Sequence, residues 1–199
     1  MRKALNHLRS SDPILAGIID RVGPYRIQYH EPTFEALARS IVFQQLSGKA
    51  AGAIYARLVD SVGAITPENL ATKAPEDLRP LGLSGQKSKY ILDLAEKTRS
   101  GVVRFQDLPD LDDDAVIEHL TQVKGVGVWT AQMFLMFALR RLDVLPTGDL
   151  GIRNATQHAY QLKEAPAPEK LEKIGQHWRP YATIACWYLW RSLDGDAAM

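Results

Sequence analysis

Two glycines and one aspartate are the residues of this chain whose types and spacing could do chemistry. Gly125 and Gly127 form a tight turn between two helical patterns, and Asp149 follows in a second short turn before another helical pattern. A helix ending near Val123 leaves carbonyls unpaired, and the next helix begins with unpaired amides at the positive end of its dipole. Glycine can adopt a positive φ and allows close approach, so this turn can hold a phosphate on backbone groups alone.

The same residues also have plain structural interpretations. A Gly-Val-Gly turn can be an ordinary corner between two helices, and Asp149 has the type and position of an N-cap before Leu150–Ala155. A carboxylate beside a sugar can stabilise positive charge that develops when a glycosidic bond breaks, and it can orient or deprotonate water. We therefore interpret Asp149 as a catalytic carboxylate that can cap the helix as well.

Composition limits the class of protein. The 199 residues are enough for one buried domain or two small lobes, and a net charge of +1 gives no bulk signal of nucleic-acid binding. The single cysteine, Cys186, cannot form an internal disulfide or supply a four-ligand metal site. The first residues lack the apolar core of a signal peptide, and the apolar stretch Trp129–Leu139 is too short to span a bilayer. We expect a soluble, intracellular protein.

Almost every segment has helical periodicity, so the expected fold class is all-α. A helix should begin at Pro13 after Asp12, and a second should begin near Thr33 and stop at Gln44–Gly48. Trp129–Leu139 is apolar nearly all round, which predicts the central buried helix. Other expected elements are a helix through Val59, short helical turns at Pro67 and Pro75, a helix over Asp113–Val123, and a frayed tail at Asp194–Met199.

Several strings resemble the helix-hairpin-helix (HhH-GPD) DNA glycosylase superfamily. The hairpin reads Leu-x-x-Val-Lys-Gly-Val-Gly-Val-Trp-Thr-Ala from Leu120, and Leu-Pro-x-x-Asp ends at Asp149. Phe-Gln-Gln-Leu-Ser from Phe43 and Trp-Tyr at Trp187 are similar to the family's groove segment and final helix. The resemblance covers about Asp12 to Leu193 and is strongest to the DNA-3-methyladenine glycosylase II group, which includes AlkA and compact yeast Mag-type enzymes.

The resemblance implies one HhH-GPD domain over residues 1–199, in the compact form without the N-terminal β-domain. It implies two helical lobes with a DNA-binding cleft between them. The expected lobes are residues 30–110, and residues 1–29 together with 111–199. The protein should be a monomer that binds double-stranded DNA containing alkylated bases and no membrane. It should act in the cytoplasm or nucleoid of a bacterium, or in the nucleus of a eukaryote.

The resemblance and the local chemistry together assign a site. Asp149 is the expected catalytic residue, and aromatic side chains should receive a flipped, electron-poor base. The expected base pocket consists of Trp129, Trp187, Phe43 and Tyr188. The expected DNA contacts are Gly125, Gly127, Val128, Thr130, Gln44, Gln45, Leu46, Lys49 and Arg153, with Lys87 as a further phosphate contact and Gln45 as the residue that fills the gap left by the base. No dissociable cofactor is expected, but the backbone carbonyls of Lys124 and Val126 are candidate ligands for structural Na⁺ or K⁺.

One departure within the superfamily bears on mechanism. Bifunctional members carry a lysine two residues after the second hairpin glycine, whereas this chain has Trp129 there. We therefore predict a monofunctional glycosylase that uses water to release 3-methyladenine or 7-methylguanine and leaves an abasic site in base excision repair. The alternatives are a non-catalytic helix-hairpin-helix DNA-binding protein and a bifunctional glycosylase-lyase for oxidised bases. The intact Leu-Pro-x-x-Asp segment opposes the first, and Trp129 and the lack of a four-cysteine cluster oppose the second.

Overall fold

The computed structural model describes residues 1–194, so all but the first residue of the expected tail lies outside the described part. The described residues contain helices, turns and irregular segments but no strand, which confirms the all-α prediction. The chain divides into two compact units. The terminal unit comprises Met1–Tyr29 and Arg140–Met199, and the central unit comprises His30–Leu139. No helix in the described part is long and apolar enough to cross a membrane.

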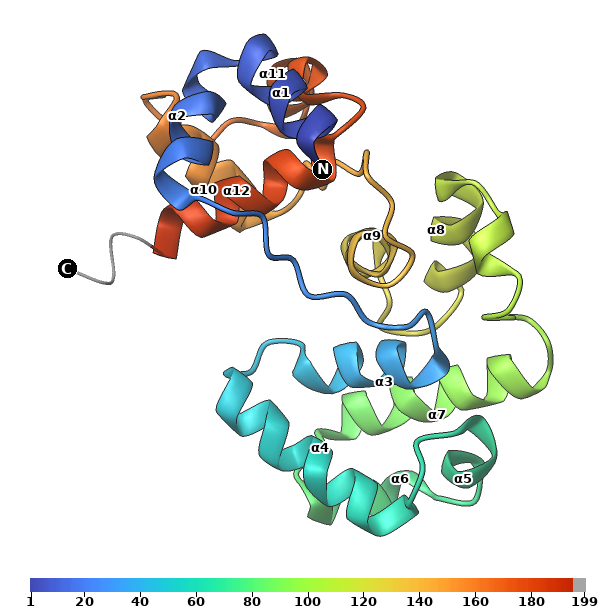
Figure 1. Cartoon of the computed structure of the whole chain (residues 1–199). Helices are drawn as coiled ribbons and strands as arrows, with labels where there is room; N and C mark the ends of the chain where they lie inside the picture. The colour runs from blue at the N-terminus through green and yellow to red at the C-terminus, as the bar shows by residue number, and fades with distance from the viewer. Residues whose placement is uncertain (195–199) are drawn as a thin grey trace. The chain divides into compact units, whose positions relative to one another are not determined.

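The central unit is built from helices that begin at recognisable side-chain caps. Thr33, Ser47 and Ser84 each accept a hydrogen bond from an amide in the first turn of the helix that they precede. In Figure 1 the blue α3 and the green α7 lie in the same unit, and α3 packs against both α4 and α7. The helices of this unit are α3 (Phe34–Phe43), α4 (Gly48–Val62), α5 (Pro67–Ala71), α6 (Pro75–Leu78), η1 (Arg79–Leu81), α7 (Gly85–Arg99), η2 (Leu108–Asp110), α8 (Asp113–Thr121) and α9 (Val128–Phe137).

The terminal unit joins the first helices of the chain to the last ones. The helix α12 packs against α2 and α10, so segments far apart in sequence share one core, as the blue and red ribbons of Figure 1 show. The helices are α1 (Arg2–Ser11), α2 (Pro13–Val22), α10 (Leu150–Ala159), α11 (Pro168–Gly175), η3 (Gln176–Trp178) and α12 (Ala182–Asp194).

A buried carboxylate holds three of these segments together. Asp12 is 6% exposed, and its Oδ1 caps α2 by accepting from the amides of Ile14 and Leu15, each at 3.0 Å. Its Oδ2 accepts from the Tyr160 hydroxyl and from Trp178 Nε1, the latter at 2.9 Å. Burial and the neighbouring Asp12 carboxylate raise the pKa of Tyr160, so its hydroxyl stays protonated as a donor.

The central unit ends at Leu139, whereas the sequence suggested a lobe boundary near residue 110. Residues 111–139 group with residues 30–110, because side chains of α7 hold the α8–α9 connection. Lys97 Nζ donates to the Gln122 carbonyl at 2.6 Å, and Asp93 Oδ2 accepts from the Lys124 amide at 2.8 Å. Neither contact could be read from local periodicity, since the partners are 25 and 31 residues apart.

The apolar helix expected over Trp129–Leu139 is observed as α9, Val128–Phe137. Most of this helix is buried: Ala131, Phe134, Leu135 and Met136 are at most 6% exposed. Its first two residues lie at the surface of the central unit, where Val128 is 54% and Trp129 47% exposed. An exposed tryptophan and valine beside a glycine turn are available to a ligand, which a fully buried helix would not allow.

Candidate active site

Side chains of α7 hold the glycine hairpin, residues 122–127, in place. Gly125 has a φ of +79°, and a Cβ there would lie 2.0 Å from Tyr90 Cδ2, so both backbone conformation and space require glycine. The Lys124 ammonium lies 3.2 Å from Asp93 Oδ1. Burial acts to raise the pKa of Asp93, but hydrogen bonds from Lys124 and Lys97 outweigh it and hold that pKa below its ordinary value. The hairpin is therefore a fixed, pre-formed turn.

The outer side of the hairpin presents the start of α9. Gly127 is the N-cap residue of this helix, and the first turn has no side-chain cap. Unlike Gly125, it has a φ of −94°, and a Cβ there would meet nothing within 4 Å. The helix N-terminus, with Val128 and Trp129 exposed beside it, can accept a phosphate on backbone amides. Thr130, also expected to contact DNA, is only 7% exposed.

A second turn, residues 44–47, connects α3 to α4 and is called the glutamine turn here. Gln45 adopts a φ of +56°, a left-handed conformation that is uncommon for a residue with a side chain. Gln44 Nε2 donates to the Gly125 carbonyl at 3.0 Å, which links this turn directly to the hairpin. Gln45 is exposed and Leu46 is 41% exposed, so both side chains are accessible at the tip of the turn.

The three basic residues expected to bind phosphates have different surroundings. Lys87 Nζ donates to the Val42 carbonyl at 2.7 Å and to the Gln44 carbonyl at 2.5 Å, and burial lowers its pKa. Its ammonium therefore stabilises the end of α3. Arg153 Nε donates to the Pro166 carbonyl at 2.8 Å in the terminal unit. Lys49 is exposed in the first turn of α4.

A cavity of about 780 Å³ lies within the central unit. Its wall brings together the glutamine turn, the hairpin and the first turns of α7 and α9. Among the aromatic residues of the wall are Phe43, Tyr90, Trp129, Phe134 and Phe137. A concave wall that combines aromatic side chains with polar ones is typical of a small-molecule or base site. Phe43 and Trp129, two of the expected pocket residues, line this cavity together.

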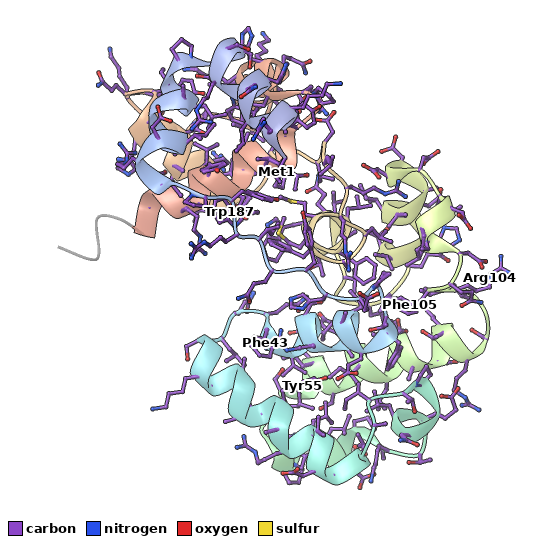
Figure 2. The ribbon with its side chains drawn as sticks, viewed as in Figure 1. Met1, Phe43, Tyr55, Arg104, Phe105 and Trp187 are labelled. Carbon is purple, nitrogen blue, oxygen red and sulfur yellow. The ribbon has the colours of Figure 1, made fainter. Side chains whose placement is uncertain are left out.

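Arg39 is a wall residue that the sequence interpretation did not select. Its guanidinium carbon lies 4.2 Å above the centroid of the Phe43 ring, within cation–π distance. Tyr55 of α4, labelled with Phe43 in Figure 2, packs edge-on against Phe43 with ring centroids 6.4 Å apart. Phe43 is therefore fixed by neighbours, and Trp129 is the more exposed of the two expected pocket aromatics. Only an i,i+4 helical spacing could have suggested the Arg39–Phe43 pair.

The other two expected pocket residues belong to the terminal unit. Trp187, labelled in Figure 2, is 8% exposed and packs against Tyr25 and Tyr188, with ring centroids 4.8 and 4.9 Å apart. Tyr188 is fully buried, and its hydroxyl donates to the Gly23 carbonyl at 2.9 Å. Burial raises the pKa of Tyr188. Tyr188 thus has the surroundings of a core residue, and neither side chain is part of the wall of the central cavity.

Asp149 lies in the terminal unit at the start of α10. A turn closed by the hydrogen bond from its amide to the Pro146 carbonyl, 2.9 Å, places it as the N-cap residue. Asp149 is 7% exposed, and its Oδ1 accepts from the Ile152 amide at 2.7 Å and from Trp190 Nε1 at 2.9 Å. The expected cap is thus observed, together with a partner in α12 that sequence reasoning missed because it lies 41 residues away.

The described residues contain no group of three or more histidine, cysteine, aspartate or glutamate side chains that could hold a metal ion. A cation at the hairpin would have to use backbone oxygens. The Gly125 carbonyl already accepts from Gln44, which leaves the expected carbonyls of Lys124 and Val126 as the candidate ligands.

Comparisons with known proteins agree with one another. A family model described as "HhH-GPD superfamily base excision DNA repair protein" matches residues 38–180. The DNA-3-methyladenine glycosylase 1 of Schizosaccharomyces pombe is 36% identical over 200 aligned residues, which cover 96% of this chain and 87% of that protein.

Two solved structures extend the likeness to the fold. A crystal structure of a DNA-3-methyladenine glycosidase from Bacillus halodurans has a TM-score of 0.87 and 39% identity, covering 98% of this chain and 90% of that one. The S. pombe 3-methyladenine DNA glycosylase Mag1 in complex with abasic DNA has a TM-score of 0.85 and 35% identity. That match covers 96% of this chain and 97% of that one.

Proposed function

The chain belongs to the HhH-GPD superfamily of base excision DNA repair proteins, and from this membership we propose that it is a monofunctional 3-methyladenine-type DNA glycosylase. It removes alkylated bases from duplex DNA by hydrolysing the N-glycosidic bond. The observation that carries this proposal is the near full-length similarity to proteins named 3-methyladenine glycosylases, one of them solved with abasic DNA. Abasic DNA is the product that such a hydrolysis leaves.

DNA binding is assigned to the hairpin and the glutamine turn of the central unit. The uncapped first turn of α9 accepts a backbone phosphate, which positions the duplex without reading its sequence. The carbonyls of Lys124 and Val126 are hard oxygen ligands that suit Na⁺ or K⁺, and such an ion would supply a positive charge for the phosphate. No dissociable cofactor is required, since the glycosidic bond breaks heterolytically: the base leaves with the bonding electrons, and no electrons pass to or from a cofactor.

Access to the glycosidic bond requires the damaged nucleotide to leave the base stack. We assign Gln45 to fill the space in the base stack that the flipped nucleotide leaves, because the glutamine turn is fixed and the Gln45 side chain is exposed. The central cavity, with Trp129 in its wall, receives the base. An N-alkylated purine is positively charged or electron-poor, so an indole face attracts it more strongly than it attracts a normal base.

Asp149 is assigned the chemistry. As the bond between C1′ and the base nitrogen breaks, the electron pair leaves with the base and positive charge develops on the sugar. The carboxylate stabilises this charge and orients water, whose oxygen bonds to C1′ while one water proton passes to the carboxylate and then to solvent. Trp129 occupies the position at which bifunctional relatives have a lysine, so the chain has no amine there to form a Schiff base with the sugar.

The test is release of free bases from methylated duplex DNA, measured by chromatography, with unmethylated duplex as the control substrate. The expected products are free methylated purines and abasic sites that break only after alkali treatment. Sodium borohydride should trap no covalent protein–DNA adduct. Intact DNA binding without any base release would favour the non-catalytic binding protein, and a trapped adduct would contradict the monofunctional mechanism.

The place of action follows from the substrate. The enzyme should work on chromosomal DNA, in the nucleoid of a bacterial cell or in the nucleus of a eukaryotic one. Localisation of the tagged protein in its source organism would check this.

A further inference from the structure

Asp149 makes two hydrogen bonds through the same carboxylate oxygen. Its Oδ1 accepts from the Ile152 amide at 2.7 Å, as a helix N-cap does, and from Trp190 Nε1 at 2.9 Å. The second bond is not needed to start a helix, because Thr33 and Asp112 cap α3 and α8 through a hydrogen bond from a first-turn amide. The contact with Trp190 therefore calls for an explanation beyond capping.

Gly151, the second residue of α10, makes room for this contact. A Cβ added to Gly151 would lie 3.1 Å from Asp149 Oδ1, 3.1 Å from Trp190 Cδ1 and 3.1 Å from Trp190 Nε1. A side chain at this position would thus press on both partners of the hydrogen bond. Gly151 has no positive φ that would itself require glycine, so the space for the indole is the physical reason for glycine here.

A second aspartate of the terminal unit provides a comparison. Asp12 also caps a helix and also accepts from an indole, Trp178 Nε1, at 2.9 Å. Its hydrogen bonds are shared between both oxygens, with two amides on Oδ1 and with Tyr160 and Trp178 on Oδ2. At Asp149 the amide and the indole both bind Oδ1. The two donors restrict rotation of the Asp149 carboxylate, so the Trp190 indole contributes to its orientation.

We propose that Trp190 is a positioning residue for the glycosylase reaction. Its indole N–H holds the Asp149 carboxylate in the orientation that the reaction at the sugar requires, and Gly151 provides the space. This inference rests on the proposed function, since it requires Asp149 to act on the substrate. Trp190 itself touches no reacting atom in this account. Misplacement of a reacting group by 1 Å can cost on the order of 100-fold in rate. Loss of the fixed carboxylate orientation should therefore lower the reaction rate measurably.

The test compares single-turnover base release by the wild type and by Trp190→Phe at saturating enzyme. The phenyl ring keeps an aromatic side chain in α12 but cannot donate to Asp149. We expect the rate constant for release to fall roughly tenfold, the value of one hydrogen bond to a charged group. Binding of abasic DNA should be unchanged. The rate constant for release should also fall in Gly151→Ala, because the added Cβ presses on Asp149 Oδ1 and on the Trp190 indole.

The matched control is Trp178→Phe, which removes an indole-to-carboxylate bond of the same length in the same unit. This control should lower the melting temperature but leave the release rate per folded molecule unchanged. A second control places Trp190→Phe in the Asp149→Asn background, where it should cause no further loss. A residue that supports only the fold would reduce the rate in both backgrounds.

Wild-type release rates for Trp190→Phe, or equal losses in Trp190→Phe and Trp178→Phe, would overturn the positioning role while leaving the proposed function intact. If Trp190→Phe does not fold, a Gly151→Ala variant with an unchanged release rate would overturn it as well. A wild-type protein that releases no base would overturn both the proposed function and this inference, and that result is visible before any variant is compared.

Discussion

Two buried aspartates of the terminal unit cap helices, and their hydrogen bonds distinguish their roles. Asp12 has all its donors within the core of the unit, where they join α2, the end of α10 and η3. Asp149 Oδ1 caps α10 and also accepts from Trp190 of α12. The first arrangement is a structural junction, whereas in the second an indole N–H helps to orient the carboxylate to which we assign the chemistry.

At the residue scale, Asp12→Ala should lower the free energy of unfolding by about 3 kcal/mol, because it leaves the Tyr160 hydroxyl and the Trp178 indole without their acceptor in a buried site. The exposed cap Asp112 is the matched control, and Asp112→Ala should cost about 1 kcal/mol. Urea denaturation of both variants measures the difference. Equal losses would show that the buried network adds nothing beyond capping.

Residues that stand in a recognisable local pattern could be selected from the sequence alone. Asp149 follows a recognisable turn, and Gly125 needs its positive φ. Sequence reasoning missed Arg39 and Trp190, because their importance depends on what they touch. The hydrogen bonds of Lys87 to two backbone carbonyls at the end of α3 were not legible either, because they join residues 45 and 43 positions apart.

At the element scale, the two hairpin glycines should respond differently to the same change. Gly125→Ala places a Cβ against Tyr90 at a positive φ, so the free energy of unfolding should fall by at least about 2 kcal/mol. Gly127→Ala has open space and an ordinary φ, so its stability should change by no more than about 1 kcal/mol.

The added methyl group of Gly127→Ala should instead weaken binding to duplex DNA, because it obstructs the approach of a phosphate to the first amides of α9. Fluorescence anisotropy with undamaged duplex, alongside thermal melting, separates the two effects. Wild-type affinity in Gly127→Ala would contradict phosphate docking at this hairpin.

The glutamine turn gives a second prediction at the element scale. Lys87→Met removes the donor to the Val42 and Gln44 carbonyls, so it should destabilise the protein by about 2 kcal/mol without changing the salt dependence of DNA binding. Lys49→Met is the matched control at an exposed position. It should leave stability unchanged and reduce the slope of log K against log salt by about 0.9 if Lys49 neutralises one phosphate.

Titration of DNA binding over a range of salt concentrations distinguishes these two lysines. A reduced slope in Lys87→Met with unchanged stability would restore Lys87 as a phosphate contact, against the present assignment.

The helical elements themselves were largely legible in the sequence. Periodic apolar residues and cap residues predicted α3 from Thr33 and α8 from Asp112, and both begin there. The apolar run at α9 predicted a buried helix, but Val128 and Trp129 at its start are exposed, because a continuous apolar run does not indicate which end of a helix reaches the surface.

At the scale of the whole molecule, the proposed roles in DNA binding and in chemistry fall to different units. The hairpin, the glutamine turn and the aromatic cavity belong to the central unit, and Asp149 with Trp190 belongs to the terminal unit. The extent of each unit could not be predicted from the sequence, because ties such as Lys97 to Gln122 cross long chain separations. The two activities should therefore be separable by mutation.

Asp149→Asn is the change that separates them most cleanly. Asparagine is as good an N-cap as aspartate and keeps an oxygen that can accept from Ile152 and Trp190, so the fold should be retained. It removes the negative charge that stabilises the sugar cation.

The most direct measurement is single-turnover release of methylated bases from duplex DNA by the wild type and Asp149→Asn side by side, with binding to abasic DNA measured in parallel. We expect the release rate to fall about 100-fold or more, with binding no weaker than that of the wild type. Release by Asp149→Asn within a few-fold of the wild type would contradict the catalytic role of Asp149, since the carboxylate would then be only a helix cap.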